Sequence, residues 1–377
     1  MNVTIAQIVS SLHLAGQERV VVDLAKAFKV RGHRSMVCST DVGGELVGEL
    51  ESSDIPCSCL RASSVYDPRS FIKVVRYLKD NRGDVVITHG NYRVIARTAA
   101  ILLKIPIILH VEHNVSDFKR AYHILLNRAF ALFTDKIVCI SEEARRSLLD
   151  IEKHQPDKVV VIRNGLNTER FTAGSNVLRD RRNMKKRVAI VGRFTEQKGH
   201  IYFVEAISQI IRSYQDVEFV FVGDGPLRSM IEAKVDERYL RDFCHFLGVR
   251  SDMDQLFPSF DMFVLSSLWE GLPISLLEAQ YFGVASVVTD VGGNAEVVQN
   301  DYNGLLVPPR DAGALATAIL RVLNDDLLRE KYSSNGRKVI EQRFSIDQMT
   351  TSYLDLIDQI SEDSGIVEEV TRRARDS

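Results

Sequence analysis

Two glutamates, Glu270 and Glu278, are separated by seven residues in the segment SSLWEGLPISLLEAQYFG at positions 266–283. Pro273 suits the first turn of a helix, where its fixed φ fits and its missing N–H is not needed. Eight helical residues at about 1.5 Å each span roughly 12 Å, on the order of the length of a diphosphate with a sugar at each end. The two carboxylates could then accept hydroxyl hydrogen bonds at either end, with helix N–H groups between them for phosphate. The spacing alone favours two glutamates without a shared task, so other segments must support the idea.

A basic loop with the sequence VGRFTEQKG occupies positions 191–199. It follows an apolar run that predicts a strand, and open α/β sheets bind ligands at strand ends. Arg193 can grip phosphate with two parallel hydrogen bonds, and Lys198 adds a compact positive charge. Because Gly192 and Gly199 bracket these charges, a phosphate-binding loop is favoured over a solvated basic loop.

The segment SSLHLAGQER at 10–19 joins the first predicted strand to the first predicted helix. Gly16 can let the backbone approach a ligand, and a helix that begins near Glu18 would supply N–H groups. An ordinary turn is an equally good interpretation. The GxGxxG pattern of dinucleotide-binding proteins is absent from this loop.

A polar cluster ends the apolar run in PIILHVEHNV at 106–115. His113 follows the predicted strand directly and is better placed than His110 to point into a cleft. A metal site is disfavoured, because no third strong ligand stands beside the two histidines and Glu112.

Short apolar runs alternate with amphipathic stretches along the chain, which predicts βαβ units and mostly parallel sheets. The predicted strands of the first half are 3–9, 35–38, 57–60, 85–88, 107–109, 137–140 and 159–162. Those of the second half are 188–191, 217–222, 262–265 and 305–307, with further strands near Phe246 and Val287. The sequence therefore predicts an α/β protein with two Rossmann-like domains.

Length and charge restrict the class of protein. A chain of 377 residues is long for one core, so two domains are expected. The net charge of −2 gives no support for a nucleic-acid partner. Residues 1–171 carry 24 Lys and Arg against 19 Asp and Glu, a net of +5. This excess would suit an anionic acceptor or a membrane surface, although variation of surface charge without a function is the favoured interpretation.

Compartment and membrane contact follow from cysteine usage and hydropathy. Five cysteines without metal-ligand spacing indicate reduced thiols in a cytoplasmic protein. No apolar stretch is long enough to span a membrane, so peripheral attachment at the inner face is the alternative to a free cytoplasmic protein. The amphipathic segment at 118–133 is expected to face the core rather than a membrane.

Taken together, these segments resemble glycosyltransferase family 4, the retaining glycosyl transferases group 1. The likeness spans about residues 3–360. The matching motifs are LAGQER (14–19), EHN (112–114), RNGLN (163–167), VGRFTEQKG (191–199), VGDGP (222–226), FLG (246–248), SSLWEGLPISLLEA (266–279), DVGGNAE (290–296) and NGLLVPP (303–309). The resemblance implies a GT-B fold, in which two Rossmann-like parallel-sheet domains face each other across a cleft.

The resemblance also implies a role for each matching residue. Arg193 and Lys198 would hold the donor diphosphate, and Glu278 would bind the ribose. Glu270 would bind hydroxyls of the donor sugar, with the backbone N–H groups of Gly271 and Leu272 nearby. In the first domain, Gly16 would approach the phosphate and His113 would lie beside the donor sugar. The stretch 246–249 would line the base. One departure is Ala15, which precedes Gly16 where the family often has a second glycine.

On this basis we expect five segments along the chain. Residues 1–171 would form the acceptor-side domain, 172–186 a linker and 187–344 the domain that binds the nucleotide-sugar donor. Residues 345–361 would form a C-terminal helix that crosses back to the first domain, followed by a charged tail at 362–377.

The expected activity is retaining, metal-independent transfer of a sugar from a nucleotide diphosphate sugar, with a UDP-sugar as the default, to a glycan or lipid-linked acceptor. Such transfer would belong to surface polysaccharide or glycolipid assembly and would need no cofactor, because the donor is a substrate. The alternatives are a catalytically silent subunit with the same fold and a nucleotide-sugar epimerase.

Overall fold

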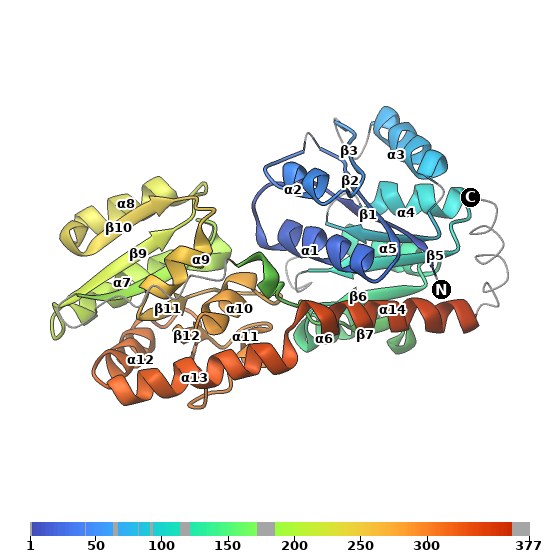
Figure 1. Ribbon diagram of the computed structural model, residues 1–377. Coiled ribbons are helices and arrows are strands. Elements are labelled where there is room, and N and C mark those ends of the chain that lie inside the picture. Colours follow the sequence, from blue (N-terminus) through green and yellow to red (C-terminus); the bar gives the residue numbers. More distant parts are fainter. Residues whose placement is uncertain are drawn as a thin grey trace. The chain divides into compact units, whose positions relative to one another are not determined.

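The computed structural model describes residues 2–41, 43–62, 67–81, 83–90, 93–113, 121–171 and 185–363. The chain divides into two compact units (Figure 1). Unit 1 comprises Met1–Gly165 together with Ile346–Ser377, and unit 2 comprises Leu166–Ser345. Each unit contains one parallel sheet with helices, so the prediction of two Rossmann-like α/β domains is confirmed.

The sheet of unit 1 has seven strands in the order β3-β2-β1-β4-β5-β6-β7, and its neighbouring strands are all parallel. Its strands are β1 (Thr4–Val9), β2 (Arg34–Ser39), β3 (Cys57–Cys59), β4 (Val85–His89), β5 (Ile107–Glu112), β6 (Lys136–Cys139) and β7 (Val159–Val161). Because parallel strands end at one edge, the residues that follow β1, β4 and β5 gather there.

Seven helices of the described residues belong to unit 1: α1 (Gly16–Val30), α2 (Val47–Ser52), α3 (Pro68–Asn81), α4 (Arg93–Leu102), α5 (Ala121–Ala131), α6 (Glu142–Asp150) and α14 (Ile346–Asp363). Helix α1 begins at Gly16, two residues before Glu18. Ala15 caps it with an ordinary extended φ of −143°, so alanine is not strained there. Helix α14 packs against α1, where Phe28 meets Tyr353 edge to face.

The sheet of unit 2 has six parallel strands in the order β10-β9-β8-β11-β12-β13. Its strands are β8 (Lys186–Val191), β9 (Val217–Val222), β10 (Cys244–Gly248), β11 (Met262–Leu265), β12 (Ala285–Thr289) and β13 (Gly304–Val307). The order reverses between β8 and β11, and ligands of open α/β sheets bind at such a switch point.

The helices described in unit 2 are α7 (His200–Ile210), α8 (Arg228–Glu237), α9 (Met253–Leu256), α10 (Ile274–Tyr281), α11 (Asn294–Val297), α12 (Ala312–Leu323) and α13 (Asp326–Arg343). Short 3₁₀ turns η2 (Thr168–Arg170) and η3 (Glu196–Lys198) also belong to this unit. The turns η4 (Arg241–Phe243) and η5 (Phe257–Ser259) lie in unit 2 as well, whereas η1 (Pro156–Lys158) lies in unit 1.

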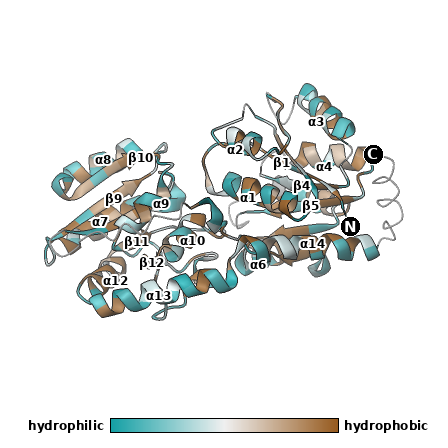
Figure 2. Ribbon diagram, viewed as in Figure 1, coloured by the Kyte–Doolittle hydropathy of each residue, from teal (hydrophilic) through white to brown (hydrophobic). Residues whose placement is uncertain are grey.

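Hydrophobic strands lie at the centre of each unit, under helices that carry one apolar face (Figure 2). In unit 2, Phe219 and Phe221 of β9 are fully buried against Phe203 of α7. Burial of each such side chain contributes about 1.5–3 kcal/mol. These cores fix the strand ends from which the polar residues described below project.

The linker predicted at 172–186 lies outside the described residues except for its last two positions, and Lys186 already belongs to β8. The core-facing interpretation of the 118–133 segment is wrong for part of α5 and the turn after it. Leu125 is 70% exposed and Leu132 is 73% exposed, while Asn127 on the same helix is buried.

Candidate active site

Lys198 and Glu270 form a buried cluster in unit 2, although they are far apart in the sequence. Lys198 ends η3, which follows β8, and Glu270 follows β11, the strand next to β8. The Lys198 Nζ lies 2.5 Å from the Glu270 Oε1. The Ser267 hydroxyl donates to the same carboxylate oxygen at 2.6 Å, and the Gln197 amide lies 3.4 Å from the other. A carboxylate that is only 3% exposed is thus neutralised and held in one orientation.

Gly199 allows the basic loop to approach the strand that precedes Glu270. Its φ is +58°, and a Cβ at this position would lie 2.1 Å from the Ser266 carbonyl oxygen. The Ser266 hydroxyl donates to the carbonyl oxygens of Lys198 and Gly199. Glycine is therefore required for both the backbone conformation and the close contact.

The DVGGNAE motif at 290–296 supports Glu270 from the other side. Gly292 has a φ of +55°, and a Cβ there would lie 1.9 Å from the Glu270 carbonyl oxygen. The N–H of Gly293 donates to the Gly271 carbonyl oxygen at 2.7 Å. Leu272 is buried beside this turn. The two glycines therefore let one loop pack directly on the backbone of Glu270 and Gly271.

The VGDGP motif at 222–226 supports the start of the basic loop in the same way. A Cβ on Gly223 would lie 2.2 Å from the Gly192 carbonyl oxygen, and one on Gly225 would lie 2.6 Å from the Phe194 carbonyl oxygen. Arg193 stands between these contacts with an exposed side chain. Within the described residues Arg193 belongs to no ion pair, so it differs from Lys198.

Glu278 lies on α10, which begins at Ile274, with Pro273 as the preceding extended cap rather than the first helical residue. The guanidinium of Arg170 donates to the Glu278 Oε1. Both side chains are mostly buried, at 16% and 11% exposure. Glu270 and Glu278 therefore each have a cationic partner of their own.

His113 in unit 1 lies beside a second histidine at the edge where β4 and β5 end. Its Nε2 is 3.0 Å from the Nδ1 of His89, and both rings are buried. Burial lowers the pKa of His113 to about 4, although Glu112 opposes this shift, and burial together with His113 holds the pKa of His89 well below its usual value. Both rings are therefore neutral at neutral pH, and one nitrogen of the pair donates to the other.

Gly16 is exposed at the start of α1, close to the same edge. The neighbouring Gln17 lies against Gly90, because a Cβ on Gly90 would be 3.1 Å from the Gln17 amide nitrogen. Gly90 follows His89 directly, so the first loop and the histidine pair are adjacent in unit 1.

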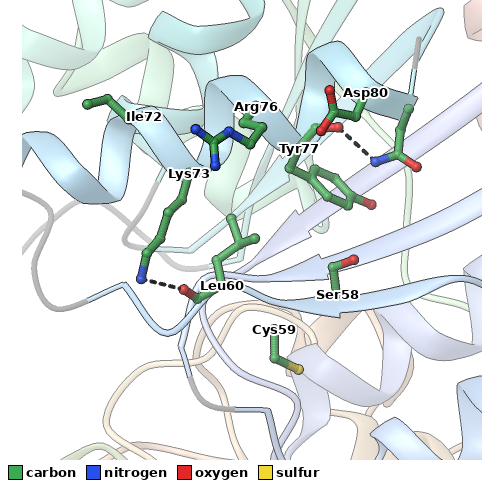
Figure 3. Close-up of a pocket in the computed structure, with 9 residues that line it drawn as sticks. Ser58, Cys59, Leu60, Ile72, Lys73, Arg76, Tyr77 and Asp80 are labelled. Atoms are coloured by element: carbon green, nitrogen blue, oxygen red, sulfur yellow. Dashed lines mark hydrogen bonds between the residues drawn. The ribbon is translucent and has the colours of Figure 1, made fainter.

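A pocket elsewhere in unit 1 contains none of the predicted residues. It has a volume of 430 Å³ and lies between β3 and α3, lined by residues that include Ser58, Arg76 and Tyr77 (Figure 3). The Lys73 ammonium at its rim donates to the Leu60 carbonyl oxygen at 2.9 Å. In the part of the chain that the structure describes, no group of three or more His, Cys, Asp or Glu side chains could hold a metal ion.

Sequence reasoning missed three residues that contact the predicted ones, namely Arg170, His89 and Ser267. A signal existed for His89, because it ends a strand that a parallel sheet places beside the strand before His113. Ser267 lies three residues before Glu270, within reach of it. No local signal marked Arg170, whose partner is 108 residues away.

Both halves of the chain match known families. Residues 14–170 match the profile of Glycosyltransferase Family 4, and residues 179–339 match that of Glycosyl transferases group 1. One similar protein is the UDP-Gal:alpha-D-GlcNAc-diphosphoundecaprenol alpha-1,3-galactosyltransferase of Escherichia coli. It is 30% identical over 327 residues, which cover 80% of this chain and 83% of that protein.

A second relative is the GalNAc-alpha-(1->4)-GalNAc-alpha-(1->3)-diNAcBac-PP-undecaprenol alpha-1,4-N-acetyl-D-galactosaminyltransferase of Campylobacter jejuni. It is 26% identical over 368 residues, which cover 94% of this chain and 98% of that protein. Among solved structures, Anabaena Alr3699/HepE in complex with UDP-glucose matches with a TM-score of 0.81 and 19% identity. That match covers 95% of this chain and 100% of the other, and it shows a shared fold.

Two Rossmann-like units with these strand orders define a protein of the GT-B class. The chain belongs to glycosyltransferase family 4, as its motifs indicated, and it is a glycosyltransferase.

Proposed function

We propose that the protein transfers a sugar from a UDP-sugar to a hydroxyl of a lipid-linked glycan acceptor, with retention of the anomeric configuration. The observation that carries this proposal is the cluster of Lys198 and Glu270 at the switch point of the unit 2 sheet. There a cation and an acid stand together on adjacent strand ends, where a diphosphate and a sugar would need them.

The donor is held through charge and hydroxyl recognition. Lys198 and the exposed Arg193 bind the diphosphate, while Glu270 accepts hydrogen bonds from the sugar and Glu278 from the ribose. The N–H groups of Gly271 and Leu272 lie close to the sugar and the phosphate. UDP is preferred as the nucleotide because the structurally similar Anabaena protein was solved with UDP-glucose.

Charge stabilisation at the leaving group accelerates the transfer. As the bond between the sugar and the diphosphate breaks, negative charge grows on the diphosphate, and fixed cations stabilise the transition state more than the ground state. Lys198 is already held by Glu270, so little reorganisation is needed. Because side-chain cations perform this task, the transfer requires no metal ion.

His113 contributes a neutral ring to the donor sugar. A neutral imidazole can accept or donate a hydrogen bond without bringing a charge to the reacting carbon. His89 fixes the orientation of that ring through the 3.0 Å contact. Gly16 lets the first loop come close to the phosphate.

The acceptor is a sugar carried on a lipid diphosphate in surface polysaccharide or glycolipid assembly, in line with the undecaprenol-linked substrates after which two relatives are named. Such an acceptor lies at a membrane. The exposed Leu125, Leu126, Leu132 and Phe133, with the exposed Arg128 among them, would allow peripheral contact with its inner face. No helix in the described part of the chain is long and apolar enough to cross a bilayer.

Incubation of the protein with UDP-, GDP- and ADP-sugars and a polyprenyl-diphosphate glycan tests the proposal. We expect turnover with a UDP-sugar, an α-linked product from an α-linked donor by NMR, and unchanged turnover after EDTA treatment. Turnover with another nucleotide, inversion, or loss of activity in EDTA would contradict the corresponding part. Absence of any transfer would favour a silent subunit, and an isomerised donor without acceptor would favour an epimerase.

A further inference from the structure

Arg170 connects the segment that enters unit 2 to the helix that carries Glu278. It is the last residue of η2, and its guanidinium donates to the Glu278 carboxylate across 108 residues of sequence. With 16% and 11% of their side chains exposed, both partners are largely withdrawn from water. A carboxylate in such a place needs a charged partner, because an unpaired buried charge is strongly unfavourable.

Arg170 is itself held in position. Its guanidinium lies over the ring of Phe171, 4.7 Å from the ring centre. That ring stacks on Tyr281 at 5.4 Å and meets Phe282 edge-on at 4.7 Å. Tyr281 is the last residue of α10 and Phe282 is its C-cap. The arginine is therefore packed against the helix that carries its carboxylate partner.

The start of the same segment is also fixed. The N–H of Leu166 donates to the Phe344 carbonyl oxygen at 2.7 Å. The side chain of Asn167 accepts from the N–H of Glu169 at 3.1 Å and so caps η2. Anchors on both sides leave the guanidinium little freedom, and a planar fork gives direction to the group that it binds.

We propose that Arg170 is a positioning residue for the ribose of the donor nucleotide. It keeps the Glu278 carboxylate turned and charge-balanced so that the carboxylate can accept hydrogen bonds from ribose hydroxyls. A carboxylate has about four acceptor positions, so it can bind Arg170 and two hydroxyls together. This inference rests on the proposed ribose role of Glu278 and extends the donor site to a residue outside the family motifs quoted above.

Binding of three probes by calorimetry tests this role, because each probe contains a different part of the donor. The probes are UDP, 2′,3′-dideoxy-UDP and inorganic pyrophosphate. ADP and GDP, each with its own dideoxy analogue, are measured in parallel. In the parent protein we expect UDP to bind at least about tenfold more tightly than its dideoxy analogue, as hydrogen bonds to a charged group allow.

Arg170→Ala should weaken the binding of UDP about tenfold, while the affinities for the dideoxy analogue and pyrophosphate stay within about twofold of the parent's. The preference for ribose would then disappear. Glu278→Gln should give the same loss. The double variant should lose no more than either single variant, because the two residues act as one unit. Arg170→Lys keeps the charge without the fork and should retain part of the preference.

Arg337→Ala is the matched control, because Arg337 lies over the Tyr281 ring of the same helix and pairs with Glu341. It should bind all three probes as the parent does. Thermal melting establishes whether each variant is folded. If Arg170→Ala does not fold, Arg170→Lys is the deciding variant. An unchanged preference of Arg170→Lys for UDP over its dideoxy analogue would then contradict the positioning role.

Three outcomes would overturn this inference, and they differ in what they imply for the proposed function. If Glu278→Gln loses the ribose preference and the Arg170 variants keep it, the positioning role is wrong while the proposed ribose site stands. Equal weakening of all three probes in Arg170→Ala would also overturn it, because that result indicates only a structural tie. If Glu278→Gln keeps the preference, the ribose role of Glu278 fails and the role of Arg170 fails with it.

Discussion

Unit 1 and unit 2 place polar side chains at the same edge of similar sheets, but they stabilise them differently. In unit 2, Lys198 and Glu270 form an ion pair at 2.5 Å. In unit 1, His89 and His113 are neutral rings whose pKa values burial has lowered. The difference shows two ways of holding a buried polar group: an ion pair in unit 2, and a hydrogen bond between neutral rings in unit 1.

This comparison predicts that the backbone under Glu270 is the most sensitive point. Gly292→Ala would place a Cβ against the Glu270 carbonyl oxygen at a positive φ, so kcat/KM should fall by more than about a hundredfold, or ~2.7 kcal/mol. Steady-state kinetics measure the change in kcat/KM, and thermal melting measures the change in stability. Gly313→Ala, in helix α12 with no atom closer than 3.4 Å to the added Cβ, is the control and should behave as the parent. Near-normal turnover of Gly292→Ala would mean that Glu270 need not be fixed.

Loss of the cation in the same cluster should have the next largest effect. Lys198→Ala should lower kcat/KM at least about tenfold, or ~1.4 kcal/mol, because the diphosphate loses a stabilising charge in the transition state. Lys234→Ala removes a lysine from an exposed pair with Glu237 in the same unit and should leave kinetics unchanged. An equal kcat/KM in Lys198→Ala and Lys234→Ala would contradict the proposed role of Lys198, because the buried pair would then matter no more than the exposed one.

The neutral pair of unit 1 should be visible in the pH dependence of stability. His113 has a pKa of about 4 when folded and about 6.5 when unfolded, so the unfolded state binds more protons between these values. The contribution of His113 to the free energy of unfolding is therefore complete above pH 6.5 and is lost as the pH falls towards 4. Between pH 6.5 and 5.5 the loss is about 1 kcal/mol.

Urea unfolding at these two pH values checks this prediction. His113→Asn should lose less stability on acidification than the parent does, by about 1 kcal/mol. His245→Asn replaces a histidine that is 45% exposed in unit 2 and should keep the parent's dependence. An unchanged dependence in His113→Asn would show that this ring is not held neutral by burial.

The smallest effect on stability is expected at the exposed apolar residues of α5 and the turn after it. Replacing Leu125 and Leu132 by serine should change the free energy of unfolding by less than about 0.5 kcal/mol for each site, because neither side chain belongs to the core. The same double variant should bind anionic vesicles more weakly in sedimentation assays. Unchanged vesicle binding would remove this surface from the proposed membrane contact.

The central strands could be predicted from the sequence because they are short apolar runs buried on both faces, as in Met262–Leu265. The sequence also carries a signal for one helix start, because Asp67 followed by Pro68 is typical of a helix N-terminus. In the structure Asp67 accepts from the N–H of Arg69, at the start of α3. The partners of the two glutamates could not be predicted, because Lys198 and Arg170 meet them across 72 and 108 residues. Sequence spacing reports neighbours on one element, whereas these pairs depend on how loops from different strands pack.

Helix α14 completes unit 1 only after the whole of unit 2 has been translated. Until Tyr353 emerges from the ribosome, the ring of Phe28 on α1 lacks the side chain that meets it edge to face. The nascent first unit therefore lacks the helix that packs against α1, while the second unit, which is continuous in the chain, can already fold. The order of synthesis thus makes the later-made unit the first that can be finished.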